Sequence, residues 1–178
     1  ISYAEGLLDA LKALGWLTYE WKTRTPLDRR EKRVVVAGTW DIIQPGHIWL
    51  LNKAKEHGHL TAIVAKDSTS QKIKGHRPVV PEKQRLRVVQ SLKPVDRAVL
   101  GHNGDILKIV EELKPDLIIL GPDQKPSESD LHEKLRQRGL QVQVLRIREA
   151  FAGCEMPSSS KIAKEAARRY RATPEPEP

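Results

Sequence analysis

A glycine-flanked turn after an apolar run is the part of this sequence best suited to bind a phosphate group. The run Val34–Ala37 is followed by Gly38, and a helix is predicted to begin near Gly46 and His47. Glycine lets backbone N–H groups approach a ligand without a Cβ in the way. A helix N-terminus attracts anions, and His47 would add a side-chain donor. The alternative is an ordinary turn entering a helix, with His47 as its first polar residue.

Two further segments are expected to meet this turn. Gly121–Gln124 follows the apolar run Leu117–Leu120, and Ser158–Ser160 precedes a basic helix. In a doubly wound sheet, ligands bind at the carboxyl ends of the strands where the strand order reverses. With the order 3-2-1-4-5, the loops after the first and fourth strands flank that point. Taken alone, the serines are equally well explained as an N-terminal cap.

A basic stretch follows the second apolar run. It contains Lys72, Lys74, His76 and Arg77. Because the carboxyl end of a strand in a parallel sheet points toward the ligand edge, we favour phosphate binding for this stretch. A solvated surface loop is the alternative.

The elements that position these segments alternate between strand and helix. Five short apolar runs predict strands at Val34–Ala37, Ala62–Ala65, Ala98–Leu100, Leu117–Leu120 and Val142–Leu145. Helices are predicted near His47–His57, Pro81–Leu92, Asp105–Leu113 and Glu128–Arg138, with a last one from Ser158 to about Arg169. Wholly apolar strands separated by helices indicate a parallel sheet covered on both faces. We therefore predict an α/β, Rossmann-like, doubly wound five-stranded parallel sheet of order 3-2-1-4-5.

Three parts are expected along the chain. Residues 1–32 predict an N-terminal helical arm and linker, with leucines at helical spacing between Leu7 and Leu14. This arm is too short to fold alone, so it should dock on the main domain or on a second subunit, and we expect a homodimer. Residues 33–170 form the main domain. Residues 171–178, rich in Pro and Glu, are predicted to be disordered.

The amino-acid composition excludes some classes of protein and favours some kinds of binding partner. A net charge of +8 suggests an anionic partner, but one Phe and three Tyr give no aromatic platform for stacking bases. A small phosphorylated ligand explains the charge as well as nucleic acid does, and nucleic acid is not expected. Cys154 is the single cysteine, which excludes an internal disulfide framework. No apolar run is long enough for a membrane span, so a cytoplasmic protein is expected.

The segment GTWDIIQPGH, residues 38–47, resembles the GT(F/W)D-x-x-H-x-G-H signature of the cytidylyltransferase-like nucleotidyltransferases. The likeness covers Arg33 to about Lys164 and is nearer to archaeal FAD synthases than to glycerol-3-phosphate cytidylyltransferases. The supporting segments are Ala65–Thr69, Lys72–Arg77, Pro81–Arg85, Pro94–Asp96, Leu120–Gln124 and Ser158–Ile162.

The resemblance implies transfer of a nucleoside monophosphate from a nucleoside triphosphate, with ATP favoured, to a phosphorylated acceptor such as FMN. Pyrophosphate would be released. Mg²⁺ or another divalent cation would accompany the triphosphate without a direct protein ligand, and Asp41 would contact it through water. Three alternatives stay open: a CTP-dependent enzyme acting on glycerol or polyol phosphate, a catalytically weakened nucleotide-binding protein, and an RNA-binding module.

The resemblance also implies which residues form the site. Catalytic roles fall on His47, Gln44, Lys72 and Lys74. Nucleotide-binding roles fall on Gly38, Thr39, Trp40, Asp41, Gly46, Gly121, Asp123, Gln124, Ser158, Ser159 and Ser160. Arg77 and Arg85 would contact the phosphate of the acceptor.

Three positions depart from the family pattern. Gln44 replaces the first histidine of H-x-G-H, so a neutral amide stands in place of a group that can carry charge. Pro122 stands where related proteins tend to have Tyr. The arginine that opens the last motif in the cytidylyltransferases has no equivalent at Gly153, and Arg146 or Arg148 would have to substitute.

Overall fold

The computed structural model describes residues 31–149, 151–153, 155 and 158–172. Nearly all of the predicted N-terminal arm and of the predicted disordered tail, as well as Cys154, lie outside the described residues. Within the described ranges, no helix is both long and apolar enough to cross a membrane.

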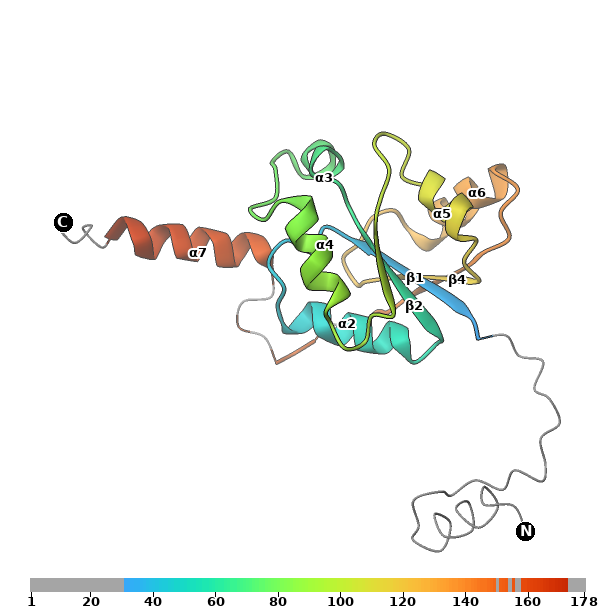
Figure 1. Ribbon diagram of the computed structural model, residues 1–178, viewed down its shortest axis with the longest axis horizontal. Helices are drawn as coiled ribbons and strands as arrows, with labels where there is room; N and C mark the ends of the chain where they lie inside the picture. Colours follow the sequence, from blue (N-terminus) through green and yellow to red (C-terminus); the bar gives the residue numbers. More distant parts are fainter. Residues whose placement is uncertain (1–30, 150, 154, 156–157, 173–178) are drawn as a thin grey trace, which may run out of the picture. The chain divides into compact units, whose positions relative to one another are not determined.

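Five parallel strands form one sheet, and their order confirms the sequence prediction. In chain order the strands are β1 (Arg33–Gly38), β2 (His59–Val64), β3 (Arg97–Leu100), β4 (Leu117–Leu120) and β5 (Gln143–Arg146). Their order in the sheet is β3-β2-β1-β4-β5, with every neighbouring pair parallel (Figure 1). The order reverses between β1 and β4, so the carboxyl ends of these two strands flank the crevice expected to bind a ligand.

The helices of the described residues are α2 (Pro45–Lys55), α3 (Asp67–Lys74), α4 (Glu82–Gln90), α5 (Lys108–Leu113), α6 (Glu128–Gln137) and α7 (Ser159–Ala172). Helices α2 and α4 pack on one face of the sheet, and α5 and α6 pack on the other. Alternate residues of β1 point to opposite faces, as a strand requires. Val34 and Val36 pack in a cluster with Leu51 of α2 and Val89 of α4, whereas Val35 packs in a second cluster that includes residues of α5 and α6. These two clusters form the core.

One helix was missed by the sequence analysis, which treated its residues only as a basic stretch. Helix α3 has few apolar residues, so no helical periodicity marks it. Its end does carry a signal, because Gly75 adopts a left-handed conformation with φ 79° and terminates the helix. Lys72 and Lys74 therefore lie on the last turn of a helix rather than in a loop.

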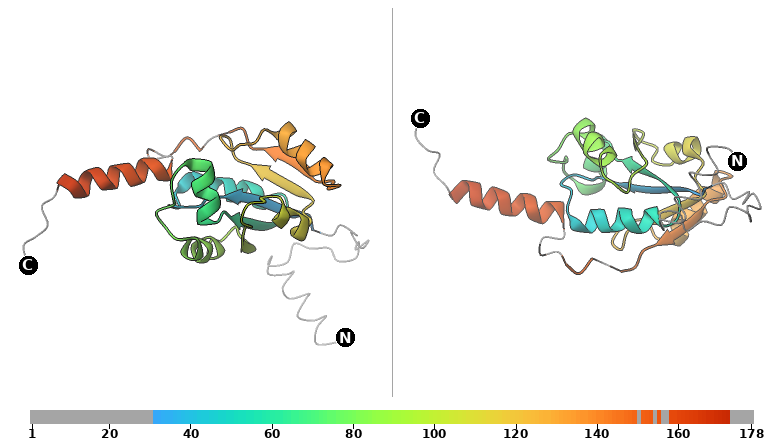
Figure 2. Two further views of the ribbon diagram at one scale, coloured as in Figure 1. Left: turned by 90° about the horizontal axis from the view of Figure 1, so that it is seen from above. Right: turned by 60° about the horizontal axis from the view of Figure 1, so that its bottom comes forward.

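Helix α7 is arranged differently from the other helices. The chain passes from β5 beneath α2, and α7 then extends away from the sheet beyond the N-terminal end of α2 (Figures 1 and 2). Its start at Ser159 agrees with the predicted start at Ser158 to within one residue.

Candidate active site

The turn after β1 is held by an internal tryptophan. Trp40 adopts a left-handed conformation with φ 53°, and its side chain is buried. Its indole Nε1 donates a hydrogen bond of 3.0 Å to the carbonyl oxygen of Ile63. A Cβ on Gly38 would lie only 2.7 Å from the indole ring, so glycine is needed there for packing. The Trp40 side chain is therefore part of the core, so the nucleotide contact predicted for this residue would have to come from its backbone.

Gln44 forms the N-terminal cap of α2. Its side-chain Oε1 accepts a hydrogen bond of 2.6 Å from the backbone N–H of Gly46. A Cβ on Gly46 would lie 3.0 Å from that oxygen, so the absence of a side chain at Gly46 makes room for the amide. Pro45 occupies the first turn, where its missing N–H costs nothing. Gln44 thus shapes the start of the helix expected to face phosphate.

His47, in the first turn of α2, is the most distinctive polar group of this site. Its ring is edge-on to that of Trp40, with centroids 5.4 Å apart. Within the described ranges, its Nδ1 is buried and has no hydrogen-bond partner. Burial lowers the pKa of His47 below 6.5, and the positive charge of Lys74 lowers it further. A buried polar atom is costly to leave unpaired, so Nδ1 of His47 is a group whose hydrogen-bonding capacity the described residues do not use.

The positive charge of Lys74, on the last turn of α3, contributes to the lowered pKa of His47, after burial. Lys72 lies on the same turn of α3, and both lysine side chains are exposed. Arg77, also exposed, donates from Nε to the side chain of Gln71 at 3.2 Å. The cationic groups predicted to bind phosphate thus lie on α3 and in the segment that follows it.

Arg85 has a different place from the one predicted. Its side chain has no exposed surface, and its guanidinium donates to the carbonyl oxygens of Thr39, Ala65 and Val80. It also forms an ion pair of 2.6 Å with Asp67 at the start of α3. The sequence prediction of an acceptor-phosphate contact is therefore corrected: this side chain joins the ends of β1 and β2 to α3 and is turned away from solvent.

The turn after β1 makes two more contacts with neighbouring segments. The Asp41 carboxylate accepts hydrogen bonds from the backbone N–H groups of Val79 and Val80, at 3.0 and 2.8 Å. Ser70 of α3, itself buried, donates its hydroxyl to Thr39 Oγ1 at 3.4 Å. The sequence analysis missed Ser70, since a single serine in a polar stretch carries no signal of burial. These contacts fix the turn against α3 and against the segment before α4.

Hydrogen bonds of two side chains, those of Gln124 and Arg146, hold the loop after β4 in place. Gln124 accepts from the N–H of Gly121 at 2.8 Å and donates to the carbonyl oxygen of Ala37 at 2.8 Å, which ties this loop to β1. Arg146 donates to the carbonyl oxygens of Gly121, Pro122, Gln124 and Pro126. Asp123 is exposed at this edge. Arg146 is thus occupied within the loop, which weighs against its substituting for the arginine missing at Gly153.

The N-terminus of α7 reaches the turn after β1. Ser159 Oγ donates to the carbonyl oxygen of Ile42 at 3.1 Å and accepts from the Ile42 N–H at 3.4 Å. Ser158 Oγ caps the helix by accepting from the N–H of Lys161 at 3.2 Å, and Ser160 is exposed. The three segments predicted to form one site therefore meet at the carboxyl edge of the sheet.

The described residues contain no group of three or more His, Cys, Asp and Glu side chains placed to hold a metal ion. Asp41, the acidic residue considered for a metal contact, is occupied by two backbone donors. This donor set fits a cation bound mainly by substrate phosphates and water, because Mg²⁺ keeps much of its hydration shell and needs few protein ligands.

Comparison with known proteins agrees with this geometry. Curated FAD synthases are similar to the chain, including that of Archaeoglobus profundus, 51% identical over 74% of this chain and 84% of the relative. The FAD synthase of Ferroglobus placidus is 49% identical over 74% of this chain and 85% of its own length.

Solved structures give the same fold. A Thermoplasma volcanium crystal structure described as a lipopolysaccharide core biosynthesis protein is 42% identical, with a TM-score of 0.65, over 68% of this chain and 99% of that one. A protein of unknown function from Archaeoglobus fulgidus, 18% identical with a TM-score of 0.51 over 65% of this chain and 88% of that one, shares the fold alone. The cytidylyltransferase-like family model matches residues 35–165. The chain belongs to the cytidylyltransferase-like family.

Proposed function

We propose that this protein transfers the AMP group of ATP to the phosphate of FMN, which forms FAD and releases pyrophosphate. The observation that carries the proposal is the buried Nδ1 of His47, unpartnered within the described ranges, at the N-terminus of α2. Such a group at a helix N-terminus, with the charge of Lys74 acting on its pKa, suits a phosphate ligand. The similar FAD synthases, which are 47–51% identical to this chain, favour FMN as the acceptor over glycerol or polyol phosphate.

The proposed reaction is a single displacement at phosphorus. An oxygen of the FMN phosphate attacks the α-phosphorus of ATP, and the bond from that phosphorus to the oxygen bridging to the β-phosphate breaks. The electron pair leaves with pyrophosphate. Because a phosphate monoester is already ionised at neutral pH, no strong general base is needed. Alignment of the reactants and stabilisation of negative charge on the phosphoryl oxygens are the main contributions.

The residues divide into three proposed groups. Thr39 and His47 would contact the α- and β-phosphates, with Gly38 and Gly46 allowing close approach of the backbone. Lys72, Lys74 and Arg77 would neutralise the acceptor phosphate or the triphosphate.

The remaining proposed contacts come from the two other segments. Gly121, Asp123 and Gln124 would lie beside the nucleoside. The N-terminus of α7, from Ser158 to Ser160, would hold the β- and γ-phosphates. Ser159 supports this wall of the site through its contact with Ile42.

Magnesium, bound to the triphosphate, would supply charge neutralisation of the phosphates. The protein would orient that complex through His47 and the lysines of α3 rather than through carboxylate ligands. The homodimer and the cytoplasmic location predicted from the sequence stay predictions.

Gln44 decides between an enzyme and a protein that only binds nucleotide. A glutamine still offers an amide donor where the family signature has histidine, so we propose turnover, slower than with histidine at this position. The alternative protein would bind ATP tightly without forming product.

The test mixes the purified protein with ATP, Mg²⁺ and FMN and measures pyrophosphate together with FAD separated by chromatography. FAD and pyrophosphate should appear in equal amounts. Parallel reactions replace ATP by CTP and FMN by glycerol 3-phosphate, and these should be slow. Product with CTP and glycerol 3-phosphate but not with ATP and FMN would overturn the assignment, as would ATP binding with no product in any combination.

A further inference from the structure

Arg146, the last residue of β5, lies beside the loop that follows β4. The register of the sheet pairs it with Leu120, the last residue of β4. Its side chain is only 15% exposed, although arginine side chains are mostly exposed in folded proteins. The guanidinium keeps its positive charge when it is buried. The groups around it must therefore replace the water that it has lost.

Backbone carbonyl oxygens are the groups that surround this guanidinium. Nη1 donates to the carbonyl oxygens of Gly121, Gln124 and Pro122 at 2.7, 2.9 and 3.2 Å, and Nη2 donates to that of Pro126 at 2.8 Å. Glu128, the first residue of α6, faces Nε at 3.7 Å. Hydrogen bonds from a charged donor are roughly twice as strong as neutral ones. One side chain thus holds most of the loop after β4.

The sequence of this loop explains why it takes a donor from outside. Pro122 and Pro126 have no backbone N–H, so the loop has fewer donors than carbonyl groups. Gln124 supplies the internal hydrogen bonds: its side chain accepts from the N–H of Gly121 at 2.8 Å, and its own N–H donates to the carbonyl oxygen of Gly121 at 3.3 Å. The carbonyl oxygens of Pro122, Gln124 and Pro126 receive their donor from Arg146.

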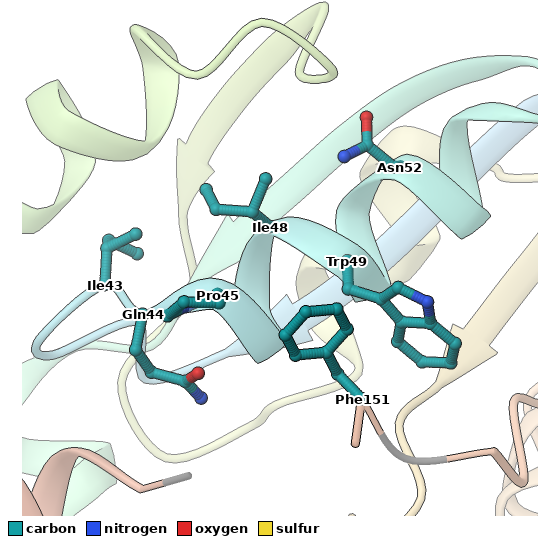
Figure 3. A pocket seen from close by; sticks show the side chains of 7 residues that line it. All are labelled: Ile43, Gln44, Pro45, Ile48, Trp49, Asn52 and Phe151. Carbon is teal, nitrogen blue, oxygen red and sulfur yellow. The ribbon is translucent and has the colours of Figure 1, made fainter. Parts of the chain in front are cut away.

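The backbone that carries Arg146 is fixed by the residues on both sides of it. The strand before it pairs with β4. After it, the N–H of Ile147 donates to the carbonyl oxygen of Leu120 at 2.9 Å, and the Ile147 side chain packs against the core. Farther along, Phe151 lines an apolar cavity along α2 (Figure 3). Arg146 is therefore a fixed point from which the loop is held.

We propose that Arg146 is a positioning residue for nucleoside binding, because it holds the loop after β4 in the shape that receives the nucleoside of ATP. This inference rests on the proposed function, in which Gly121, Asp123 and Gln124 lie beside the nucleoside. Arg146 bonds to the residues on either side of Asp123, so it sets the place of this exposed carboxylate. A loop that is ordered in advance lowers the cost of ordering it when the ligand binds.

A direct contact of Arg146 with the triphosphate is the alternative role. Four carbonyl oxygens and the carboxylate of Glu128 already surround its nitrogen atoms. A phosphate group would have to displace some of them, and the loop would then lose its donor. The two roles differ in one measurable respect. Positioning of the loop affects the binding of a nucleoside, whereas a phosphate contact also affects the binding of inorganic tripolyphosphate.

The first test measures the binding of ATP and of inorganic tripolyphosphate, each with Mg²⁺, by isothermal titration calorimetry of the full chain. Arg146→Met should bind ATP at least about tenfold more weakly, because the loop is no longer ordered in advance, and should bind tripolyphosphate like the wild type. Arg146→Lys keeps the charge but not the planar fork of donors, so its affinity for ATP should be intermediate. Arg136→Met removes an exposed arginine of α6. It is the matched control and should bind both ligands like the wild type.

Steady-state kinetics of FAD formation give a second readout. The KM of Arg146→Met for ATP should rise about tenfold while kcat and the KM for FMN change less than about twofold, the pattern expected when ground state and transition state lose binding equally. Amide hydrogen exchange should become faster in the loop after β4 and stay unchanged in β4 itself. That contrast distinguishes a released loop from a protein that has lost its fold.

Equal affinity of the wild type and Arg146→Met for ATP would overturn the proposal, and so would an equal loss of affinity for ATP and for tripolyphosphate. Neither binding measurement needs an acceptor, so both outcomes count whether or not FAD forms. FAD formation by Arg146→Met with an unchanged KM for ATP would overturn the proposal and leave the proposed function intact. A selective loss of ATP affinity in a protein that forms no FAD would support the proposal and contradict the proposed function. If Arg146→Met does not fold, the same comparisons apply to Arg146→Lys.

Discussion

The imidazole of His47 lies edge-on to the indole of Trp40, with ring centroids 5.4 Å apart and an angle of 69° between the planes. The indole is itself fixed by its hydrogen bond to Ile63. A residue buried in the core therefore sets the position of a residue at the ligand edge. Within the motif, Trp40 therefore orients the imidazole, and His47 is the residue that we propose to contact phosphate.

Replacing His47 by alanine is expected to lower kcat/KM for FAD formation by about 100- to 1,000-fold, the usual cost of losing one donor to a transition-state oxygen. The variant should still fold, with a modest fall in melting temperature, because the partly buried ring loses its contact with Trp40 but no hydrogen bond from Nδ1. Pyrophosphate release at varied ATP measures the effect. His57→Ala, at an exposed position, is the control and should retain full activity; unchanged activity of the His47 variant would remove it from the site.

The ionisation of His47 should depend on Lys74. Burial and the charge of Lys74 both lower the pKa of His47 below 6.5, so Lys74→Gln should raise this pKa while the contribution of burial remains. Proton NMR titration of the imidazole measures it directly. Lys72→Gln is the control. Equal pKa values of His47 in wild type and Lys74→Gln would show that the charge of Lys74 does not act on the imidazole.

The same shift has a consequence for stability. The folded state binds a proton at His47 less readily than the unfolded state does, whose pKa is near 6.5. The unfolded state therefore holds more protons as the pH falls below about 6.5, and stability decreases with acidification until the folded pKa is passed. Urea unfolding between neutral pH and pH 5 should show a smaller loss in His47→Asn than in the wild type.

Gln44 caps α2, and we propose that its amide also donates to phosphate; a pair of substitutions separates these two roles. Gln44→Glu keeps an oxygen to accept from the N–H of Gly46 and adds negative charge at a helix N-terminus, which is favourable there. It removes the amide donor and repels phosphate. We expect near-normal stability but a loss of activity of at least tenfold. Gln44→Ala should lose the cap as well, at a cost of about 1 kcal/mol. Chemical denaturation and steady-state kinetics distinguish the two effects, and full activity of Gln44→Glu would contradict a donor role.

Replacing Gln44 by the histidine of the family signature tests the same position through an expected gain of activity. Gln44→His should raise turnover above that of the wild type, since an imidazole can place a charged donor on phosphate. A wild type that turns over no substrate, combined with a strongly active Gln44→His, would indicate a nucleotide-binding protein that has lost catalysis.

The strand order and the meeting of three segments at one edge followed from the sequence, because wholly apolar runs alternating with helices admit few topologies. The direction of individual side chains did not follow. Trp40 and Arg85 lie within segments that resemble the family signature, and a motif does not state which of its residues face the ligand and which support it. Helix α3 was not predicted for a related reason. Its polar sequence carries no periodic pattern of apolar residues, and its position is set by contacts of Ser70 and Asp67 with distant segments.

Replacing Arg85 measures how much such a supporting side chain contributes to the free energy of unfolding. Its guanidinium joins the carbonyl oxygens of Thr39, Ala65 and Val80 to the carboxylate of Asp67, and its side chain is wholly buried. Replacement by methionine leaves these acceptors without their donor. Breaking a buried ion pair costs about 3–5 kcal/mol, and because Asp67 is partly exposed we expect the lower end of that range.

The matched control is Arg87→Met, which removes an exposed arginine from the same helix. It should change the free energy of unfolding by less than about 0.5 kcal/mol. Arg85→Lys keeps a charge but cannot reach four acceptors from one ammonium group, so it should be intermediate in stability. Its kcat should fall more than its KM for ATP rises, since a displaced Thr39 turn misaligns the phosphates rather than removing a contact. Equal stability of the Arg85 and Arg87 variants in urea would show that the buried guanidinium does not hold the turn.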